Sequence, residues 1–398
     1  MKEYIPREKY IERVRPFMGT ELIKVFTGQR RVGKSYLLYE LMDMVTGAGS
    51  EVIYINKELG DFDGIRDYRD LYGYIKKQKH SDGKTAVFID EIQEVVQFEK
   101  ALRSLAAEGG YDLYCTGSNA MLLSGELATL LSGRYIEIRV FPLTYAEFLV
   151  FRDLPDSSEA LEHYLKYGGL PYLKNLPLDD DVVFDYLKNV YEAILYRDVV
   201  GRYGVRNVGF LERLVGFLAH HTGSLFSARN IVRYLKSQEI RISVSALLDY
   251  LGYLANAFFI VRVGRSDIRG KKIFEVGEKY YFTDVGLRNV IAGYSPFEKG
   301  MILENVVFSH LLSCGYKVFV GKTGEKEIDF IAEKGGERVY IQVALYLNEE
   351  STVKREFGNL MQIKDNYPKY VITMDKSGGV SYQGIRHLPL REFLLNFE

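Results

Sequence analysis

The chain of 398 residues has no tryptophan, only two cysteines, and a formal net charge of −1. Cys115 and Cys314 lie in separate apolar stretches far apart in the sequence. They predict buried thiols in reduced surroundings rather than a disulfide. No CxxC pair and no His/Cys cluster indicates zinc. The near-zero net charge excludes a global basic field for nucleic acid, while a local basic patch stays open.

Long apolar runs are missing as well. No stretch of about 18 or more apolar residues occurs, so the sequence predicts no membrane span. The segment Met1–Arg15 is charged and lacks the apolar core of a signal peptide. A cytoplasmic protein is therefore expected. The 47% hydrophobic and 26% charged residues are typical of an ordinary globular protein, and the length predicts two or three domains.

The first part of the chain alternates short apolar runs with longer amphipathic segments. Strands are expected over residues 23–26, 52–55, 86–89, 113–116 and 136–140, with helices over 35–45 and 98–107 between them. Strands that alternate with helices indicate an α/β fold with a parallel sheet covered on both faces.

The sequence pattern changes after Pro142, from alternating strands and helices to mainly helical segments. Helices are expected over residues 144–152, 157–166 and 180–200, the last capped by Asp179–Asp181. Three further helices (210–221, 227–237 and 243–256) and two strands (259–263 and 272–282) form a winged-helix pattern. A final α/β block has strands near 317–320, 328–332, 339–344 and 370–373. The predicted domains are a P-loop ATPase domain (1–142), a helical lid or connector (143–204), a winged helix (205–290) and an α/β domain (297–398).

Residues 28–35 form a phosphate-binding loop of the pattern G-x-x-x-x-G-K-S, which follows a predicted strand and opens a predicted helix. Its glycines let backbone N–H groups face phosphates. Lys34 is expected to reach the β- and γ-phosphates of ATP, and Ser35 to place its hydroxyl on Mg²⁺. The predicted nucleotide-binding residues are Gly28, Gln29, Arg30, Arg31, Val32, Gly33, Lys34, Ser35 and Tyr36.

Two carboxylates follow the third predicted strand. Asp90 is placed to hold Mg²⁺, and Glu91 to act as the general base that activates water. Two acids that cap the next helix are the alternative explanation. Because water activation suits this pair better than a phosphoryl acceptor does, ATP hydrolysis is favoured over a small-molecule kinase.

Two further residues are candidates for the same site. Ser118 or Asn119, after the fourth strand, is predicted to hydrogen-bond the γ-phosphate or the attacking water, and a helix cap is an equally open explanation. Arg134, before the fifth strand, is predicted to neutralise γ-phosphate charge, in its own subunit or in a neighbouring one. A surface ion pair is the alternative for Arg134.

These residues together resemble a prokaryotic family of AAA+-type P-loop ATPases in which a winged helix and a C-terminal restriction-endonuclease-like domain follow. The resemblance is carried by residues 28–35, Asp90-Glu91-Ile92-Gln93, Gly117-Ser118, Ser132-Gly133-Arg134, Phe141-Pro142-Leu143, Tyr196-Arg197-Asp198 and Glu327-Ile328-Asp329-Phe330. It implies ATP, Mg²⁺ and a cytoplasmic ATPase whose nucleotide cycle controls the C-terminal domains. A slow nucleotide-dependent switch that contacts DNA or a protein partner is the alternative. The sequence leaves open whether the chain assembles into a homo-oligomer.

The resemblance also bears on the C-terminal block. Endonucleases of this fold place an acid on a helix, an Asp on one strand and Glu-x-Lys on the next. Here Glu304 and Asp329 match, while Gln342 replaces the second acid and Ala344 replaces the lysine. A fold that is kept without cleavage is therefore expected.

The winged-helix region gives a mixed signal for DNA. The third helix, 243–256, shows Ser245 and Asp249 outside its apolar stripe and is poor in base readers. Basic residues lie instead in the second helix (Arg229, Arg233, Lys236) and around the hairpin turn (Arg262, Arg265, Arg269, Lys271, Lys272). Non-specific phosphate contacts are expected from them. A solvated loop on a helical scaffold is an equally open alternative.

Overall fold

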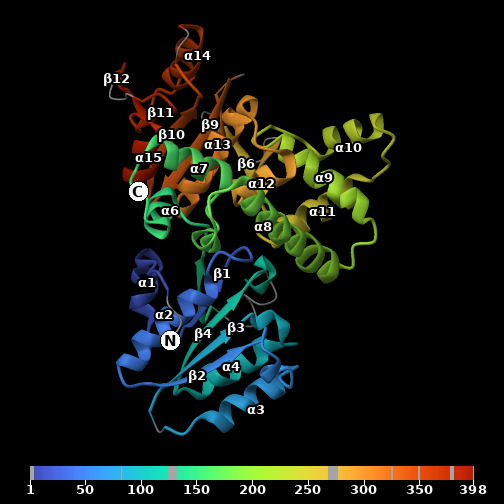
Figure 1. Ribbon diagram of the computed structural model, residues 1–398, viewed down its shortest axis with the longest axis vertical. Helices are drawn as coiled ribbons and strands as arrows, with labels where there is room; N and C mark the ends of the chain where they lie inside the picture. The colour runs from blue at the N-terminus through green and yellow to red at the C-terminus, as the bar shows by residue number, and fades with distance from the viewer. Residues whose placement is uncertain are drawn as a thin grey trace. The chain divides into compact units, whose positions relative to one another are not determined.

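The computed structural model describes residues 4–81, 83–123, 131, 133–267, 277–323, 326–347, 350–376 and 381–397. The chain forms two compact units, one of residues 1–141 with 256–258 and one of residues 142–255 with 259–398 (Figure 1). The predicted end of the P-loop domain at residue 142 coincides with this division.

The first unit is built on a parallel sheet of five strands in the order β2-β3-β4-β1-β5. The strands lie within two residues of their predicted bounds, which confirms the parallel α/β prediction. They are β1 (Ile23–Thr27), β2 (Glu51–Asn56), β3 (Thr85–Asp90), β4 (Tyr111–Gly117) and β5 (Tyr135–Arg139).

Helices cover the sheet of the first unit. They are α1 (Glu8–Val14), α2 (Lys34–Gly47), α3 (Tyr68–Gln78) and α4 (Phe98–Glu108). The buried faces of α3 and α4 pack on one face of the sheet, where Leu71 and Leu102 join Val25 and Val87 in a single apolar cluster. α2 runs from the end of β1 and contacts β2, β3 and β4 (Figure 1).

The second unit contains an eight-stranded mixed sheet in the order β12-β13-β11-β10-β9-β8-β6-β7. The antiparallel pair β6 and β7 lies where the sequence predicts the hairpin of a winged helix, and β6 also pairs in parallel with β8. The winged-helix region and the C-terminal block, which the sequence predicts as separate domains, therefore share one sheet. The strands are β6 (Ile260–Asp267), β7 (Glu278–Phe282), β8 (Lys317–Thr323), β9 (Lys326–Lys334), β10 (Glu337–Val343), β11 (Lys369–Thr373), β12 (Ser381–Tyr382) and β13 (Ile385–Pro389).

The second unit also contains helices, some of which pack on this sheet. They are α6 (Tyr145–Arg152), α7 (Ser158–Tyr167), α8 (Asp180–Glu192), α9 (Val208–His220), α10 (Ala228–Ser237), α11 (Val244–Asn256), α12 (Val285–Ala292), α13 (Lys299–Ser313), α14 (Glu350–Met361) and α15 (Leu390–Asn396). α6 and α7, the first helices of the expected lid, share one hydrophobic core with α13, α15 and the sheet. Asp179 caps α8 as predicted, but the α-helix ends at Glu192 and continues as a π-helix over Ala193–Gly201.

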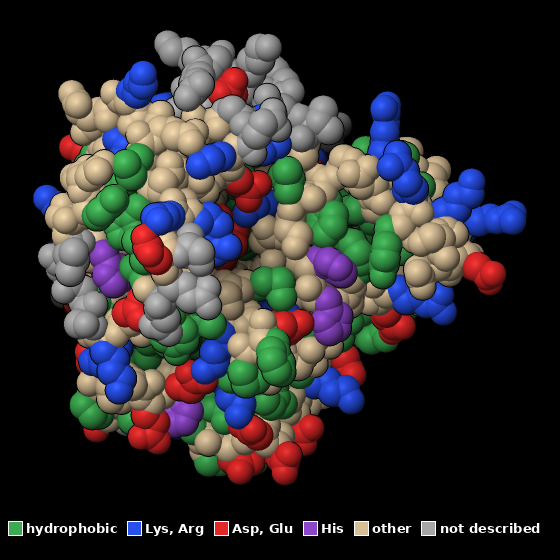
Figure 2. All heavy atoms as spheres, turned by 90° about the horizontal axis from the view of Figure 1, so that it is seen from above, with side chains coloured by type: hydrophobic (Ala, Val, Ile, Leu, Met, Phe, Trp, Pro, Cys, Tyr) green, Lys and Arg blue, Asp and Glu red, His purple; other side chains and the backbone are tan. Residues whose placement is uncertain are grey.

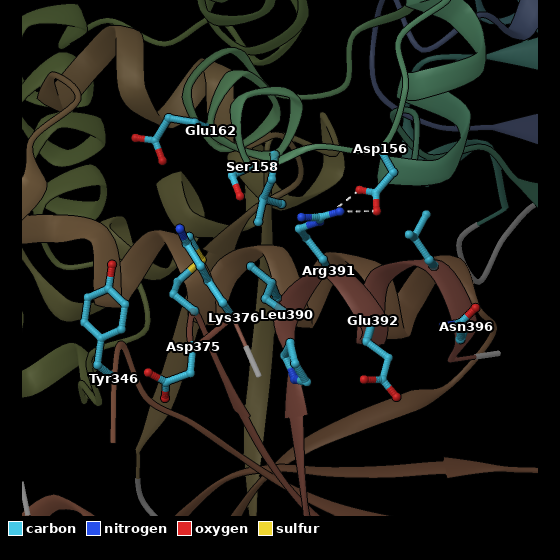
Figure 3. Close-up of a pocket in the computed structure, with 14 residues that line it drawn as sticks. Asp156, Ser158, Glu162, Tyr346, Asp375, Lys376, Leu390, Arg391, Glu392 and Asn396 are labelled. Carbon is cyan, nitrogen blue, oxygen red and sulfur yellow. Dashed lines mark hydrogen bonds and ion pairs between the residues drawn. The ribbon is translucent and has the colours of Figure 1, made fainter. Parts of the chain in front are cut away.

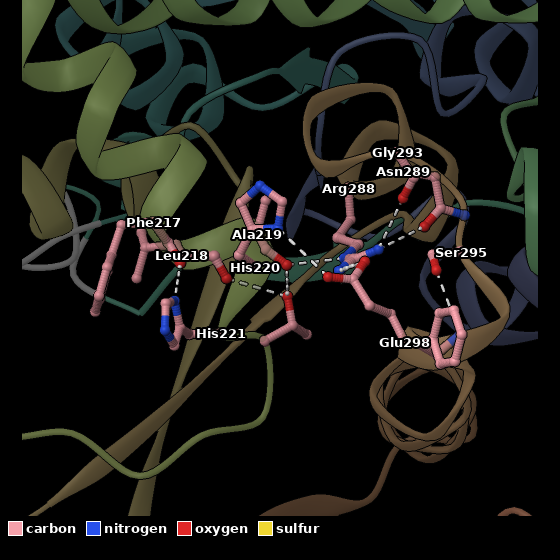
Figure 4. A network of polar contacts seen from close by, with 12 residues as sticks. Phe217, Leu218, Ala219, His220, His221, Arg288, Asn289, Gly293, Ser295 and Glu298 are labelled. Atoms are coloured by element: carbon pink, nitrogen blue, oxygen red, sulfur yellow. Dashed lines mark hydrogen bonds and ion pairs between the residues drawn. The ribbon is translucent and has the colours of Figure 1, made fainter.

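A buried arginine joins α9 to α12. Arg288 is 1% exposed and donates to the Ala219 carbonyl at 2.8 Å, the Gly293 carbonyl at 3.2 Å and the Glu298 carboxylate at 2.7 Å (Figure 4). Glu298 also lies 3.4 Å from the ring of His220. Because each donor of the planar guanidinium has a fixed direction, these bonds hold the end of α9 in one place.

A second buried charged residue, Asp284, holds the loop between α7 and α8 against α12. Asp284 caps α12 through the Leu287 N–H at 3.1 Å and accepts the Gly169 N–H at 2.7 Å. Gly286 is required beside it, since a Cβ there would lie 2.0 Å from the Tyr167 carbonyl oxygen.

Asp284→Ala should lower the free energy of unfolding by about 2–3 kcal/mol, because the backbone N–H groups of Gly169, Gly286 and Leu287 lose their acceptor. Urea denaturation of the full chain measures this as a lower midpoint. Asp179→Ala is the matched control, since it removes the exposed cap of α8 and should cost only about 1 kcal/mol. Equal effects of the two substitutions would contradict the structural role given to Asp284.

Candidate functional site

The predicted nucleotide-binding groups meet at one edge of the five-stranded sheet. β1, β3 and β4 are parallel neighbours, with Phe26 opposite Thr116 and Ile89 opposite Cys115. Their carboxyl ends therefore lie side by side. The phosphate loop follows β1, Asp90 and Glu91 end β3, and Ser118 follows β4, so the three segments converge as the sequence predicts.

The phosphate loop needs both of its glycines. Gly28 has φ +148°, and a Cβ there would lie 2.3 Å from the Val140 carbonyl oxygen. Gly33, with φ 94°, is the N-cap of α2. Arg31 also adopts a positive φ, 70°, and is exposed, as is Tyr36 at the first turn of α2. The loop thus leads directly into a helix amino end, the arrangement in which backbone N–H groups bind phosphate.

Lys34 lies inside this loop rather than in solvent. It is 4% exposed, and its ammonium donates to the carbonyl oxygens of Gly28 and Gln29 at 3.0 Å each. The side-chain amide of Gln29 is fully buried, and neither of its polar atoms has a partner among the described residues. Arg30 is also buried and pairs with Glu58 at 3.3 Å. The predicted cradle therefore concentrates positive charge at the carboxyl edge.

Asp90 and Ser35, the two predicted Mg²⁺ ligands, are neighbours. Asp90 is 2% exposed and its carboxylate contacts the hydroxyls of Thr116 and Ser35. Burial raises the pKa of Asp90 above its usual value, against the opposing effect of these hydrogen bonds and of the Lys34 charge. A divalent cation would favour the charged carboxylate. An oxygen-only pair that leaves most positions to water also suits Mg²⁺, so these residues fit that ion.

Glu91 occupies a constrained position one residue later. Its φ is 56°, in the left-handed region, and its N–H donates to the Thr116 hydroxyl at 2.9 Å. The side-chain amide of Gln93 and the Ser118 hydroxyl, the latter at 3.3 Å, donate to its carboxylate. Burial alone would raise the pKa of Glu91, but the charge of Lys34 and these hydrogen bonds lower it overall. The carboxylate therefore stays ionised and oriented, as a general base requires.

Three residues that the sequence reasoning left without a role hold this edge together. Thr116 bridges Asp90 and Glu91 through one hydroxyl. Gln93 orients the Glu91 carboxylate. Arg7 is 5% exposed and donates to the carbonyl oxygens of Val32, in the loop, at 3.1 Å and of Phe141 at 3.0 Å. The advance signals are a polar side chain at a strand end for Thr116 and the place of Gln93 in the Asp90-Glu91-Ile92-Gln93 motif; Arg7 is joined to the loop by no local pattern.

Asn119 and Arg134 lie at opposite edges of the five-stranded sheet. Asn119 follows β4 at the carboxyl edge, is 3% exposed and precedes the 3₁₀ turn Ala120–Leu123. Arg134 is exposed, and its carbonyl accepts the Ile23 N–H at 2.9 Å, so it lies at the amino end of β1. The phosphate loop is at the other end of that strand, about 13 Å away. Ser132, part of the same motif, lies outside the described residues.

Both cysteines are free thiols, and Cys115 is buried as predicted, with a pKa that burial raises to about 12. Cys314 is half-buried rather than buried. In the part of the chain that the structure describes, no helix is long and apolar enough to cross a bilayer.

The acids of the C-terminal block surround a lysine. Lys279 on β7 has a side chain that is 3% exposed, with its ammonium 2.8 Å from Glu304, 2.8 Å from Glu327 and 3.9 Å from Asp329. The Tyr281 hydroxyl donates to Glu304 at 2.6 Å. Burial alone would lower the pKa of Lys279, but the three carboxylates raise it above its usual value. The ammonium thus offsets part of the negative charge of these acids, while burial and the Glu304 charge raise the pKa of Asp329 well above its usual value.

The remaining residues of that pattern are also in place. The Gln342 side-chain oxygen lies 3.4 Å from the Asp329 backbone nitrogen, and Ala344 is buried just past the end of β10. Within the described part of the chain, no three His, Cys, Asp or Glu side chains are arranged to hold a metal ion.

A separate pocket of about 770 Å³ lies in the second unit between α7, α15 and the end of β11 (Figure 3). Arg391 reaches across it to Asp156, with one hydrogen bond at 3.0 Å. Glu162, Asp375 and Lys376 also line it, so both charge signs are present and no single ligand charge is favoured. None of the predicted ATP-site residues lines this pocket.

Family models match two parts of the chain. A family model described as an AAA domain matches residues 20–149, and one described as a domain of unknown function matches residues 158–298. An uncharacterized protein of Haemophilus influenzae is 37% identical over 402 residues, with 99% of each chain covered. An uncharacterized protein of Methanocaldococcus jannaschii is 30% identical over 380 residues, which cover 89% of this chain and 83% of that protein. The solved structure of the Aeropyrum pernix ORC1 protein in complex with DNA is 14% identical, with 73% of this chain and 93% of that chain covered and a TM-score of 0.31.

Proposed function

We propose that this chain, which belongs to the same family as the Haemophilus influenzae and Methanocaldococcus jannaschii relatives and carries an AAA domain, binds ATP with Mg²⁺ and hydrolyses it. The observation that carries the proposal is the meeting of Lys34 and Ser35 with Asp90 and Glu91 at one sheet edge. Each of these groups has one task in phosphoryl transfer to water.

The phosphate loop binds the nucleotide. Its backbone N–H groups and the amino end of α2 face the phosphates, and Lys34 exchanges the Gly28 and Gln29 carbonyls for phosphate oxygens. Ser35 and Asp90 would hold Mg²⁺, which would supply positive charge to the phosphates. Gln29, buried without a partner among the described residues, is available to the nucleotide.

Hydrolysis falls to Glu91. Its carboxylate takes a proton from water as the water oxygen forms a bond to the γ-phosphorus and the bond to the β-phosphate oxygen breaks. Gln93 and Ser118 fix the direction of the carboxylate. Asn119, buried beside them, hydrogen-bonds the γ-phosphate or the water. The change from ATP to ADP and phosphate completes the nucleotide cycle by which the first unit controls the second.

Arg134 acts, in this proposal, on the nucleotide of a neighbouring subunit in a homo-oligomer. Its position at the amino end of β1 leaves a full strand length between it and the phosphate loop of its own chain. An exposed arginine at that distance reaches phosphate only across a subunit contact.

The alternative is a slow nucleotide-dependent switch that contacts DNA or a protein. It shares the binding groups and differs in turnover. Steady-state ATP turnover measured with and without DNA separates the two.

For the C-terminal block we propose a retained fold without nuclease activity. Lys279 supplies the positive charge that the three carboxylates require, at distances of 2.8–3.9 Å. Moving a divalent ion into that position means displacing a buried ammonium, and Gln342 and Ala344 offer neither a charge nor a general base.

The first prediction separates binding from hydrolysis. Lys34→Ala should remove most nucleotide affinity, because it deletes the charge that faces the phosphates. Glu91→Gln should keep ATP bound and stop turnover, because it removes the base and spares the loop. Glu108→Gln is the matched control, because Glu108 is an exposed glutamate at the last residue of α4, the helix that precedes β4. Calorimetry and phosphate release measure the two effects, and wild-type turnover by Glu91→Gln would refute the role of Glu91.

The second prediction concerns Arg134. Arg134→Ala should lower turnover by about 10³–10⁵-fold and change ATP affinity little, because a trans-acting arginine works in the transition state. Mixing Arg134→Ala with Glu91→Gln protein should restore part of the activity, since mixed contacts contain one intact site. A monomer by light scattering, with no recovery on mixing, would rule out the proposed action in trans.

The third prediction concerns nuclease activity. Plasmid, linear and single-stranded DNA incubated with the full chain and Mg²⁺ or Mn²⁺ should remain uncut, because the Lys279 ammonium lies among the acids and Gln342 and Ala344 replace the second acid and the lysine. Gel electrophoresis gives the readout. Cleavage by the wild type that disappears in Asp329→Ala would overturn the proposal.

A further inference from the structure

A short segment of the chain returns from the second unit to the first. Residues 256–258 belong to the first unit, although the residues before and after them belong to the second. The segment joins the end of α11 to β6. Two of its residues, Ala257 and Phe258, are buried. A displacement of this segment would therefore act on a helix and a strand of the second unit at once.

Phe258 has an unfavourable backbone conformation. Its φ is 53°, in the left-handed region, where a bulky side chain is strained. The Phe259 N–H donates to the Leu254 carbonyl at 3.0 Å, so Phe258 occupies the position after a helix end at which glycine is usual. Strain of this kind persists only where surrounding contacts compensate for it. The contacts of the Phe258 ring therefore have to offset the strain.

Arg139 on β5 makes such a contact. Its guanidinium carbon lies 5.2 Å from the centre of the Phe258 ring and 4.9 Å from the centre of the Phe141 ring. Burial lowers the pKa of Arg139, against the raising effect of the Glu137 charge. A desolvated cation interacts with an aromatic face more strongly than an exposed one does. Phe141, Arg139 and Phe258 are called the aromatic clamp below.

The aromatic clamp is tied to the phosphate loop through β5. Arg139 pairs with Thr27, the last residue of β1 before the loop. Val140 donates to the Thr27 carbonyl at 2.7 Å, and its own carbonyl oxygen would lie 2.3 Å from a Cβ on Gly28. Lys34 in turn donates to the Gly28 carbonyl at 3.0 Å. A turn of the Gly28 peptide therefore pushes on Val140, the neighbour of Arg139.

α1 provides a second connection between the loop and the clamp. One nitrogen of Arg7 donates to the carbonyl of Val32, in the loop, and to the carbonyl of Phe141, in the clamp. The Phe141 N–H donates to the Tyr10 hydroxyl at 3.0 Å. Both polar groups of the Phe141 backbone are thus bound to α1, so a shift of the loop is felt at the Phe141 ring.

We propose that nucleotide binding at the phosphate loop releases Phe258 from the aromatic clamp and so loosens the joint between α11 and β6. When Lys34 turns from the Gly28 carbonyl to the phosphates, Gly28 and Val140 shift and Arg139 moves off the Phe258 ring. The backbone strain at Phe258 then favours release, because the ring contact no longer offsets it. This inference rests on the ATP binding proposed above and not on hydrolysis.

The joint belongs to the part of the second unit that carries exposed basic side chains. α11 follows α10, on which Arg229, Arg233 and Lys236 are exposed. Figure 2 shows Lys and Arg side chains over the part of the molecule at the right, where Figure 1 places α10. A looser joint would give these helices more freedom to move.

Hydrogen exchange of the full chain, measured by mass spectrometry with and without β,γ-methylene ATP and Mg²⁺, tests the proposal. Peptides that contain Phe259 report on the joint, because the Phe259 N–H is bonded to the Leu254 carbonyl. Their exchange should become about 5-fold faster or more when the analogue is bound, the lower end of common coupling between sites. Calorimetry on the same samples measures the binding of the analogue.

Phe258→Gly should remove this response and keep the fold, because it deletes the ring and suits the left-handed backbone. The analogue should then bind about 5-fold more tightly or more, since binding no longer has to open the clamp. Arg139→Met should act in the same way, while Arg139→Lys should keep the response because a cation still faces the rings. Asp153→Gly is the matched control, since it relieves a left-handed residue (φ 50°) at the end of α6.

A wild type that binds the analogue with unchanged exchange around Phe259 overturns the proposal. So does a Phe258→Gly variant that responds to the analogue like the wild type, or an Asp153→Gly variant with an equal gain in affinity. A wild type that shows no binding by calorimetry overturns the proposed ATP binding and this inference with it, so the two failures are distinguished.

Discussion

Parallel pairing of β1 with β4 and of β4 with β3 is the constraint on which the site of the first unit depends. Since parallel neighbours end at the same edge, three segments far apart in sequence deliver their polar groups to one place. A shift of one residue in either pairing would turn Asp90 or Thr116 to the opposite face. The buried apolar side chains of the same strands prevent such a shift, so the hydrophobic core fixes the relative positions of these polar groups.

The two adjacent carboxylates at this edge differ in their electrostatics. Asp90 has a raised pKa because burial outweighs its hydrogen bonds, while Glu91 has a lowered pKa because Lys34 and its donors outweigh burial. Two groups with opposed shifts are suited to different tasks. The residue whose charge is costly gains from a cation, and the residue whose charge is already stabilised stays ionised.

Local patterns in the sequence predicted the parallel sheet, the phosphate loop and the carboxylate pair, because each depends on residues that are close in the chain. The pairing of β6 with β8, the Arg7 bonds to the phosphate loop and the place of Lys279 among the acids were not predictable in this way. Each of these contacts joins segments that lie tens of residues apart. The hydrophobic periodicity within each segment gives no sign of the contact. The π-helix after Glu192 was missed because its composition does not differ from that of an α-helix.

The shared eight-stranded sheet has a consequence for how such chains diversify. β6 contributes hydrogen bonds to β7 on one side and to β8 on the other, and Lys279 of β7 neutralises acids carried by α13 and β9. A gene fusion that exchanged only the part after residue 297 would leave an open strand edge on one piece and unbalanced buried acids on the other. Recombination among relatives should therefore preserve the hairpin and the C-terminal strands as one inherited block, even where the helices before them are replaced.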